Sequence, residues 1–132
     1  MTGRAFLLRV ELNDVSGEIV RAAITVHSAL GPGLLESAYR ACLCHELSKR
    51  GLRSDVEVVL PLKYDGVTID VGYRLDLLVE DAVIVELKTV RKLLPVHQAQ
   101  LLSYLRLSKR RLGLLINFNV YRLLDGVKRM VV

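Results

Sequence analysis

The stretch that decides the fold is Asp76-Leu-Leu-Val-Glu-Asp-Ala-Val-Ile-Val-Glu86-Leu-Lys88, in which two apolar runs flank a short acidic turn. Glu86 and Lys88 are two residues apart in an apolar run, so both side chains project from the same face of one strand. If the turn centres on Asp81, the preceding strand places Asp76 directly opposite Glu86. The stretch therefore predicts a β-hairpin that brings two carboxylates and an ammonium group together at a buried sheet.

Burial of two acids and a lysine is costly unless the charges have partners. One interpretation is structural, with Lys88 forming a buried ion pair with Asp76 or Glu86. The other is a divalent-cation site, because Mg²⁺ prefers oxygen ligands and a carboxylate pair leaves coordination positions for water and a phosphate oxygen. In the second interpretation Lys88 orients or deprotonates the attacking water, or stabilises charge that develops on phosphorus.

Helical patterns flank this hairpin on both sides. The spacing of apolar residues predicts a helix over 14–30 that Asn13 or Asp14 caps, and a second helix from about 33 to 50. The second helix carries an apolar stripe of Leu35, Tyr39, Leu43 and Leu47. Pro95 opens a third helix that extends to about residue 107.

Strand patterns fill most of the remaining chain. Residues 56–63 alternate with period two, and Asp65-Gly66 is a hairpin turn signal that leads into a strand through residues 73–79. Further strands are expected over 82–88 and 112–119, and Asp125-Gly126 predicts a second hairpin between 121–124 and 127–132. The order α-α-β-β-β-α-β-β predicts an α/β (α+β) domain with three layers around a mixed sheet.

Length and composition agree with a single packed domain. The chain has 132 residues, of which 52% are hydrophobic and 25% are charged, so a disordered protein is excluded. We expect an N-terminal arm over 1–12 and one domain over 13–132. No apolar run approaches the roughly 18 residues of a membrane span, and the N-terminus lacks a secretory signal pattern, so we expect a cytoplasmic location and no membrane partner.

Charge is divided unevenly along the chain. Residues 1–87 hold 9 Lys/Arg and 13 Asp/Glu, whereas residues 88–132 hold 10 Lys/Arg and one acid, Asp125. An ordinary solvated surface could produce this division by chance. The alternative is a polyanion-binding face beside a cation-binding carboxylate cluster.

Two predicted helices add polar residues to the constellation. Glu36 and Tyr39 share one helix face, and His97, Gln100 and Tyr104 lie close to one face of another. Each has a structural interpretation: Glu36 complements a helix dipole, Tyr39 is a core aromatic, and the other three line a solvated helix face. Together with the acids and the lysine, they favour a catalytic site.

The ordered motifs resemble a known family. Asp76…Glu86-Leu-Lys88, followed by Gln100-x-x-x-Tyr104, looks like the PD-(D/E)XK nuclease superfamily, and more closely the small bacterial GxxExxY proteins within it. Leu75 stands where the superfamily often has proline, at a position that varies. The matching motifs are Gly33-x-x-Glu36-x-x-Tyr39, Val26-His27-x-x-Leu30-Gly31-Pro32-Gly33-Leu34 with His97 later in the chain, Val83–Lys88, Gly113–Phe118 and Asp125–Arg129.

The resemblance covers about residues 13–132 and implies a restriction-endonuclease-like core. It implies that Asp76 and Glu86 bind Mg²⁺ or Mn²⁺ and that Lys88 is the catalytic lysine. By the same resemblance Glu36 is a supplementary metal ligand from the first core helix, and Gln100 and Tyr104 are an auxiliary pair near the scissile phosphate.

The leading hypothesis is therefore a metal-dependent nuclease that acts on DNA, structured or branched DNA included, and less readily on RNA. The alternative is a catalytically silent module that retains the fold and binds nucleic acid or protein, and a homodimer or a protein partner is a further expectation. Only 5% of residues are aromatic, which disfavours a single-strand stacking platform. The expected contacts to backbone phosphates are Lys92, Arg106, Lys109, Arg110, Arg111, Lys128 and Arg129.

Overall fold

The structure is a computed structural model that describes residues 2–132, with side chains from residue 11 onward. Within residues 2–132, three helices and seven strands follow one another, with one short 3₁₀ helix, η1, before the last strand. Their bounds are α1 (Thr2–Leu30), α2 (Glu36–Lys49), β1 (Ser54–Val59), β2 (Leu62–Tyr64), β3 (Val67–Ile69), β4 (Arg74–Val79), β5 (Val83–Lys88), α3 (Pro95–Ser108), β6 (Leu112–Asn117), η1 (Leu123–Gly126) and β7 (Val127–Val131).

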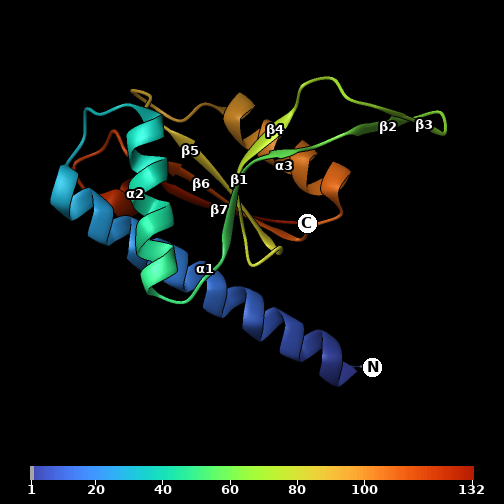
Figure 1. Cartoon of the computed structure of the whole chain (residues 1–132), viewed down its shortest axis with the longest axis horizontal. Coiled ribbons are helices and arrows are strands. Elements are labelled where there is room, and N and C mark those ends of the chain that lie inside the picture. The colour runs from blue at the N-terminus through green and yellow to red at the C-terminus, as the bar shows by residue number, and fades with distance from the viewer. Residues whose placement is uncertain (1) are drawn as a thin grey trace.

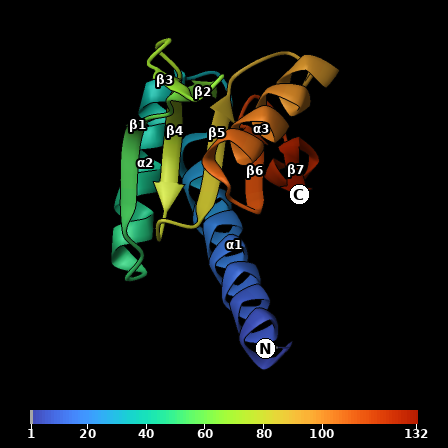
Figure 2. The ribbon, with the colours of Figure 1, turned by 90° about the vertical axis from the view of Figure 1, so that its right-hand side faces the viewer.

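The central sheet has five strands in the order β1-β4-β5-β6-β7. Among the described strands, only β5 and β6 run parallel, and α3 forms the crossover between them, as parallel neighbours require. Helices α1 and α2 cover one face of the sheet and α3 covers the other (Figures 1 and 2). The expected three-layer arrangement around a mixed sheet is confirmed.

Each face of the sheet has its own apolar core. On the α1/α2 face, Tyr39, Leu43 and Leu47 of α2 pack with alternate residues of β5 and β6. On the α3 face, Leu101 and Leu105 pack with Ile84 and Leu115. The two clusters use opposite sides of the same strands, which explains why β5 and β6 read as continuous apolar runs.

The helix boundaries differ from the prediction at two points. Helix α1 begins at Thr2, so Asn13 and Asp14 lie inside the helix and the predicted cap there is wrong. Leu35 is 76% exposed and precedes the first residue of α2, so it is not part of the buried stripe. The rest of the stripe is confirmed, because Tyr39, Leu43 and Leu47 are fully buried.

The predicted long hairpin around Asp65-Gly66 is divided into two sheets. The turn itself is confirmed, since β2 and β3 pair across it, but this short hairpin is separate from the β1–β4 pair and extends away from the body of the molecule (Figure 1). Residues 70–73 lie outside any strand, and there the Gly72 N–H donates to Asp70 Oδ1 at 2.9 Å while Gly72 has a φ of +87°. This turn separates β3 from β4, which begins at Arg74 and belongs to the five-stranded sheet.

The predicted C-terminal hairpin at Asp125-Gly126 is wrong. These residues belong to the 3₁₀ helix η1, and β7 pairs antiparallel with β6 instead of folding back on residues 121–124. The reason is spatial, since the edge of β6 offers a row of unpaired backbone groups that β7 satisfies. Within residues 2–132, no helix combines the length and the apolar character needed to cross a membrane.

Candidate active site

The site lies where β4 and β5 separate. Their backbone ladder pairs Val79 with Val83, Leu78 with Ile84 and Leu77 with Val85, and the described register stops there. Continuing the register by one step places Asp76 opposite Glu86, as the sequence predicts.

At this step side chains replace the backbone ladder. The Asp76 N–H donates to Glu86 Oε1 at 3.2 Å, and the Leu87 N–H donates to Asp76 Oδ2 at 2.9 Å. Each carboxylate is thereby held by one oxygen through the neighbouring strand's backbone. Hydrogen bonds from two adjacent strands thus hold the two acids side by side. A catalytic site needs such preorganisation.

The side chains of β4 also switch from one face of the sheet to the other at Asp76. Leu77 and Val79 pack in the α1/α2 cluster, yet Leu75 packs in the α3 cluster. In a regular strand, residues two apart share a face, so the alternation is interrupted between Leu75 and Leu77. This interruption lies where β4 parts from β5.

Glu86 lies in an electrostatically unfavourable position for a carboxylate. Its side chain is almost completely buried, and burial together with the negative charge of Asp76 raises the pKa of Glu86 to about 8. The Lys88 ammonium lies close enough to oppose this rise. In the described part of the chain, Lys88 forms no ion pair with either acid, so the buried ion-pair interpretation lacks its contact.

The donor set fits a divalent cation. Asp76 and Glu86 supply hard oxygen ligands, and within residues 11–132 no donor group hydrogen-bonds the remaining oxygen of either carboxylate. A cation would cancel the charge repulsion that raises the pKa of Glu86. Among the described residues, no group of three His, Cys, Asp or Glu side chains is close enough to share one ion, so Glu36 does not join the pair in this conformation.

Glu36 is placed near the site by a different contact. Glu36 Oε2 accepts a hydrogen bond of 3.3 Å from the N–H of Thr89, the residue directly after Lys88. The Tyr39 hydroxyl donates to Gly31 O and accepts from the Leu34 N–H at 3.2 Å. The Gly33-x-x-Glu36-x-x-Tyr39 motif therefore ties the start of α2 both to its preceding loop and to the end of β5.

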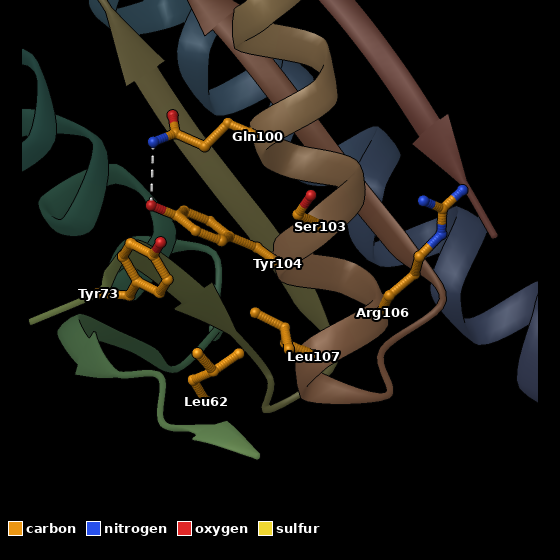
Figure 3. Close-up of a pocket in the computed structure, with 7 residues that line it drawn as sticks. All are labelled: Leu62, Tyr73, Gln100, Ser103, Tyr104, Arg106 and Leu107. Atoms are coloured by element: carbon orange, nitrogen blue, oxygen red, sulfur yellow. Dashed lines mark hydrogen bonds between the residues drawn. The ribbon is translucent and has the colours of Figure 1, made fainter. Parts of the chain in front are cut away.

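Helix α3 brings one of its polar pairs to the carboxylates. Gln100 Nε2 donates to the Tyr104 hydroxyl at 3.0 Å (Figure 3), and burial followed by the charge of Glu86 raises the pKa of Tyr104. His97 lies one turn earlier, where its Nδ1 accepts from the Leu94 N–H at 2.9 Å. In this conformation His97 therefore caps the helix.

The predicted phosphate-binding residues do not form one face. Lys92 and Lys128 line the same cavity near the start of α3, together with Arg91. Arg110 instead bonds Asp81 at the opposite end of β5, with Lys109 and Arg111 beside it in the chain. Arg129 hydrogen-bonds Asn13, and Arg106 lies exposed on α3.

Two residues of the site, Asn117 and Tyr73, were absent from the prediction. Asn117 is buried at the end of β6, where its side chain accepts from the Val90 N–H and donates to Val90 O, holding the segment after β5. Tyr73 lies beside Tyr104 with ring centroids 5.8 Å apart. The signal for Asn117 was available, because it is a polar residue that ends an apolar strand; Tyr73 carried no comparable signal.

Comparisons with known proteins agree with this geometry. A model of the PD-(D/E)XK nuclease superfamily matches residues 13–130, nearly the whole chain. Comparison with curated proteins and with solved structures finds no match. The closer resemblance to GxxExxY proteins is compatible with these findings and stays a prediction. With the mixed sheet, the paired carboxylates and the adjacent lysine in place, the chain belongs to the PD-(D/E)XK nuclease superfamily.

Proposed function

We propose that this protein hydrolyses phosphodiester bonds in DNA with the help of a divalent cation. The observation that carries the proposal is the pair of carboxylates, Asp76 and Glu86, that replace the backbone ladder where two buried strands separate. Membership of a nuclease superfamily supports the reaction class. The choice of DNA, of Mg²⁺ or Mn²⁺ and of individual residue roles is our proposal.

Asp76 and Glu86 would hold the cation through the oxygens that the backbone leaves free. When bound, the cation supplies Lewis-acid polarisation of the scissile phosphate and lowers the pKa of a water ligand. Lys88 projects from the same face of β5 as Glu86, and its ammonium would orient the attacking water or donate to a phosphate oxygen.

The supporting residues act on position and charge. Glu36 holds Thr89 and thus the end of the strand that carries Lys88, and its role as a further ligand stays a prediction. Gln100 and Tyr104 would contact the substrate near the scissile phosphate. Lys92 and Lys128 line a cavity of about 550 Å³ with Arg91 and would hold a neighbouring backbone phosphate.

The test is cleavage of supercoiled, linear, branched and single-stranded DNA in the presence of Mg²⁺ or Mn²⁺, with RNA of matched sequence beside them. We expect cleavage that Asp76→Ala and Lys88→Ala abolish, whereas His45→Ala, an exposed titratable residue of α2, serves as the matched control. Calorimetry with Mg²⁺ and Mn²⁺ measures cation binding independently of cleavage. Failure to cut any substrate, together with no cation binding, would leave the silent binding module as the function.

A further inference from the structure

A pocket opens between α3, β2 and Tyr73, the residue before β4 (Figure 3). Its volume is about 480 Å³, within the range of small-ligand sites. Two tyrosines, two leucines and two small or amide side chains surround it, with the stem of one arginine at the rim: Tyr73, Tyr104, Leu62, Leu107, Gln100, Ser103 and Arg106.

Tyr104 is the residue that the pocket shares with the candidate active site. This residue is buried beside the site, and the charge of Glu86 contributes to its raised pKa. Its hydroxyl is held by Gln100 at 3.0 Å, so its ring is fixed at the pocket wall. A group bound in the pocket would therefore be close to a phosphate that is held at Asp76 and Glu86.

Tyr73 supplies the accessible aromatic surface. It is 42% exposed, and its ring is tilted by 49° against Tyr104, so the two rings do not close over each other. The backbone fixes its place, because Tyr73 O accepts from the Leu60 N–H at 3.0 Å and the Asp70–Gly72 turn precedes it. A planar ligand can stack on a ring that is positioned in this way.

The chemistry of the walls points to a nucleobase. Aromatic rings bind the face of any base, the leucines Leu62 and Leu107 cover its edges, and the Gln100 amide can hydrogen-bond its polar groups. The Arg106 guanidinium points away from the space between the two tyrosines (Figure 3), so the interior of the pocket carries no positive charge. A phosphate alone would find no partner charge there, whereas a neutral base would fit.

We propose that this pocket binds an unpaired base next to the cleaved phosphodiester, which rests on the proposed nuclease function. A base in a duplex is stacked and paired, and its extrusion costs free energy that an unpaired base does not require. The preferred substrates are therefore single strands, flaps and branch points in place of fully paired DNA. The low aromatic content of the chain disfavours a stacking site. The fold nevertheless brings together two tyrosines, Tyr73 and Tyr104, from different segments of the chain.

The test separates binding from cleavage by working with a chelator present. Fluorescence anisotropy would measure the affinity of the wild type, Tyr73→Ala and Tyr73→Phe for a single strand, a blunt duplex and a single strand with abasic sites. Tyr121→Ala is the matched control, because Tyr121 is 97% exposed and lies outside the pocket. We expect Tyr73→Ala to weaken single-strand binding by roughly 5- to 100-fold, with Tyr73→Phe and the control near wild type.

Two further results decide the outcome. Tyr73→Ala should leave binding of the duplex and of the abasic strand within about two-fold of wild type. Ser103→Trp, at an exposed position of α3 that lines the pocket, should fill the space and remove the preference for single strands without unfolding the protein.

An equal loss on paired and unpaired DNA, or no loss in either variant, would overturn the pocket assignment even if the enzyme cleaves DNA. A selective loss without cleavage of any substrate would support the pocket and contradict the proposed reaction. Because binding is measured without a cation, the two failures cannot be confused.

Discussion

The two ends of the β4–β5 pair differ in what holds them together. At the turn end, Val79 pairs with Val83 through the backbone, and Arg110, in the loop between α3 and β6, bonds Asp81 in the turn. At the other end the described ladder stops, and the carboxylates of Asp76 and Glu86 accept the backbone hydrogen bonds. The turn end is held by regular pairing, whereas the open end places the buried Glu86 beside the half-buried Asp76, an arrangement that destabilises the fold and creates a site.

The difference between the two ends indicates that a functional site can form where the backbone pairing of two strands is interrupted. At the open end the described backbone pairing stops one step earlier, and the side chains of Asp76 and Glu86 take its place. The cost appears in the raised pKa of Glu86, because burial and the charge of Asp76 both oppose its ionisation. Variants at the two ends should therefore affect different properties.

The largest expected effect lies at the open end, in catalysis. Lys88→Met keeps the length of the side chain and removes the ammonium, so we expect cleavage to slow by about 10²- to 10⁴-fold. Thermal unfolding should change little, because Lys88 has no ion pair among the described residues. Steady-state cleavage rates measure the effect, and retained activity would remove Lys88 from the mechanism.

Next in size is a loss of stability within the intact ladder. Ile84 pairs with Leu78 and is fully buried beneath α3, so Ile84→Ala should lower the free energy of unfolding by about 2–5 kcal/mol. Urea denaturation would measure this change, with Val56→Ala on β1 as a control because Val56 is 50% exposed. A loss as small as that of the control would contradict the packing described for this face.

The third prediction concerns pH. The pKa of Glu86 is raised from 4.5 to about 8 in the folded protein, so the protonated acid stabilises the fold fully below pH 4.5. Without a divalent cation, the free energy of unfolding should fall as pH rises from about 4.5 to 8. Glu86→Gln keeps an acceptor for the Asp76 N–H and should recover roughly 1 to 3 kcal/mol at pH 8.5.

Urea titrations at several pH values would measure how the free energy of unfolding depends on pH. At pH 8.5, Mg²⁺ should raise the free energy of unfolding of the wild-type protein, and it should raise that of Glu86→Gln much less. The same pH dependence in both proteins would show that the buried acid at the open end does not control the fold in this range.

The smallest expected effect compares basic residues at the two ends. Lys92→Ala, near the open end, should weaken DNA binding few-fold and reduce the salt slope by about 1, as loss of one phosphate contact does. Arg110→Ala should change DNA binding and the salt slope less, because Asp81 already binds that guanidinium. It should lower the free energy of unfolding by less than about 1 kcal/mol. Equal effects on DNA binding would indicate that the substrate spans both ends of the sheet.

Prediction from sequence succeeded where local patterns are strong. The opposition of Asp76 and Glu86 followed from a symmetric turn, and the α2 stripe followed from helical spacing. It failed at Asp125-Gly126, where a turn signal belongs to a 3₁₀ helix because β7 finds the edge of β6. It also failed at Leu35, since apolar spacing alone does not tell where a helix begins.

The sequence by itself determined which acids and which lysine share the hairpin, because alternation and turn length are local properties of the chain. Only the tertiary structure decided that Tyr73 meets Tyr104, that Glu36 reaches Thr89, and that the basic residues lie at two ends of the sheet. Those contacts join residues far apart in the chain, and which of them form depends on how the layers pack. Periodicity fixes the face on which a side chain lies, but packing chooses its neighbours.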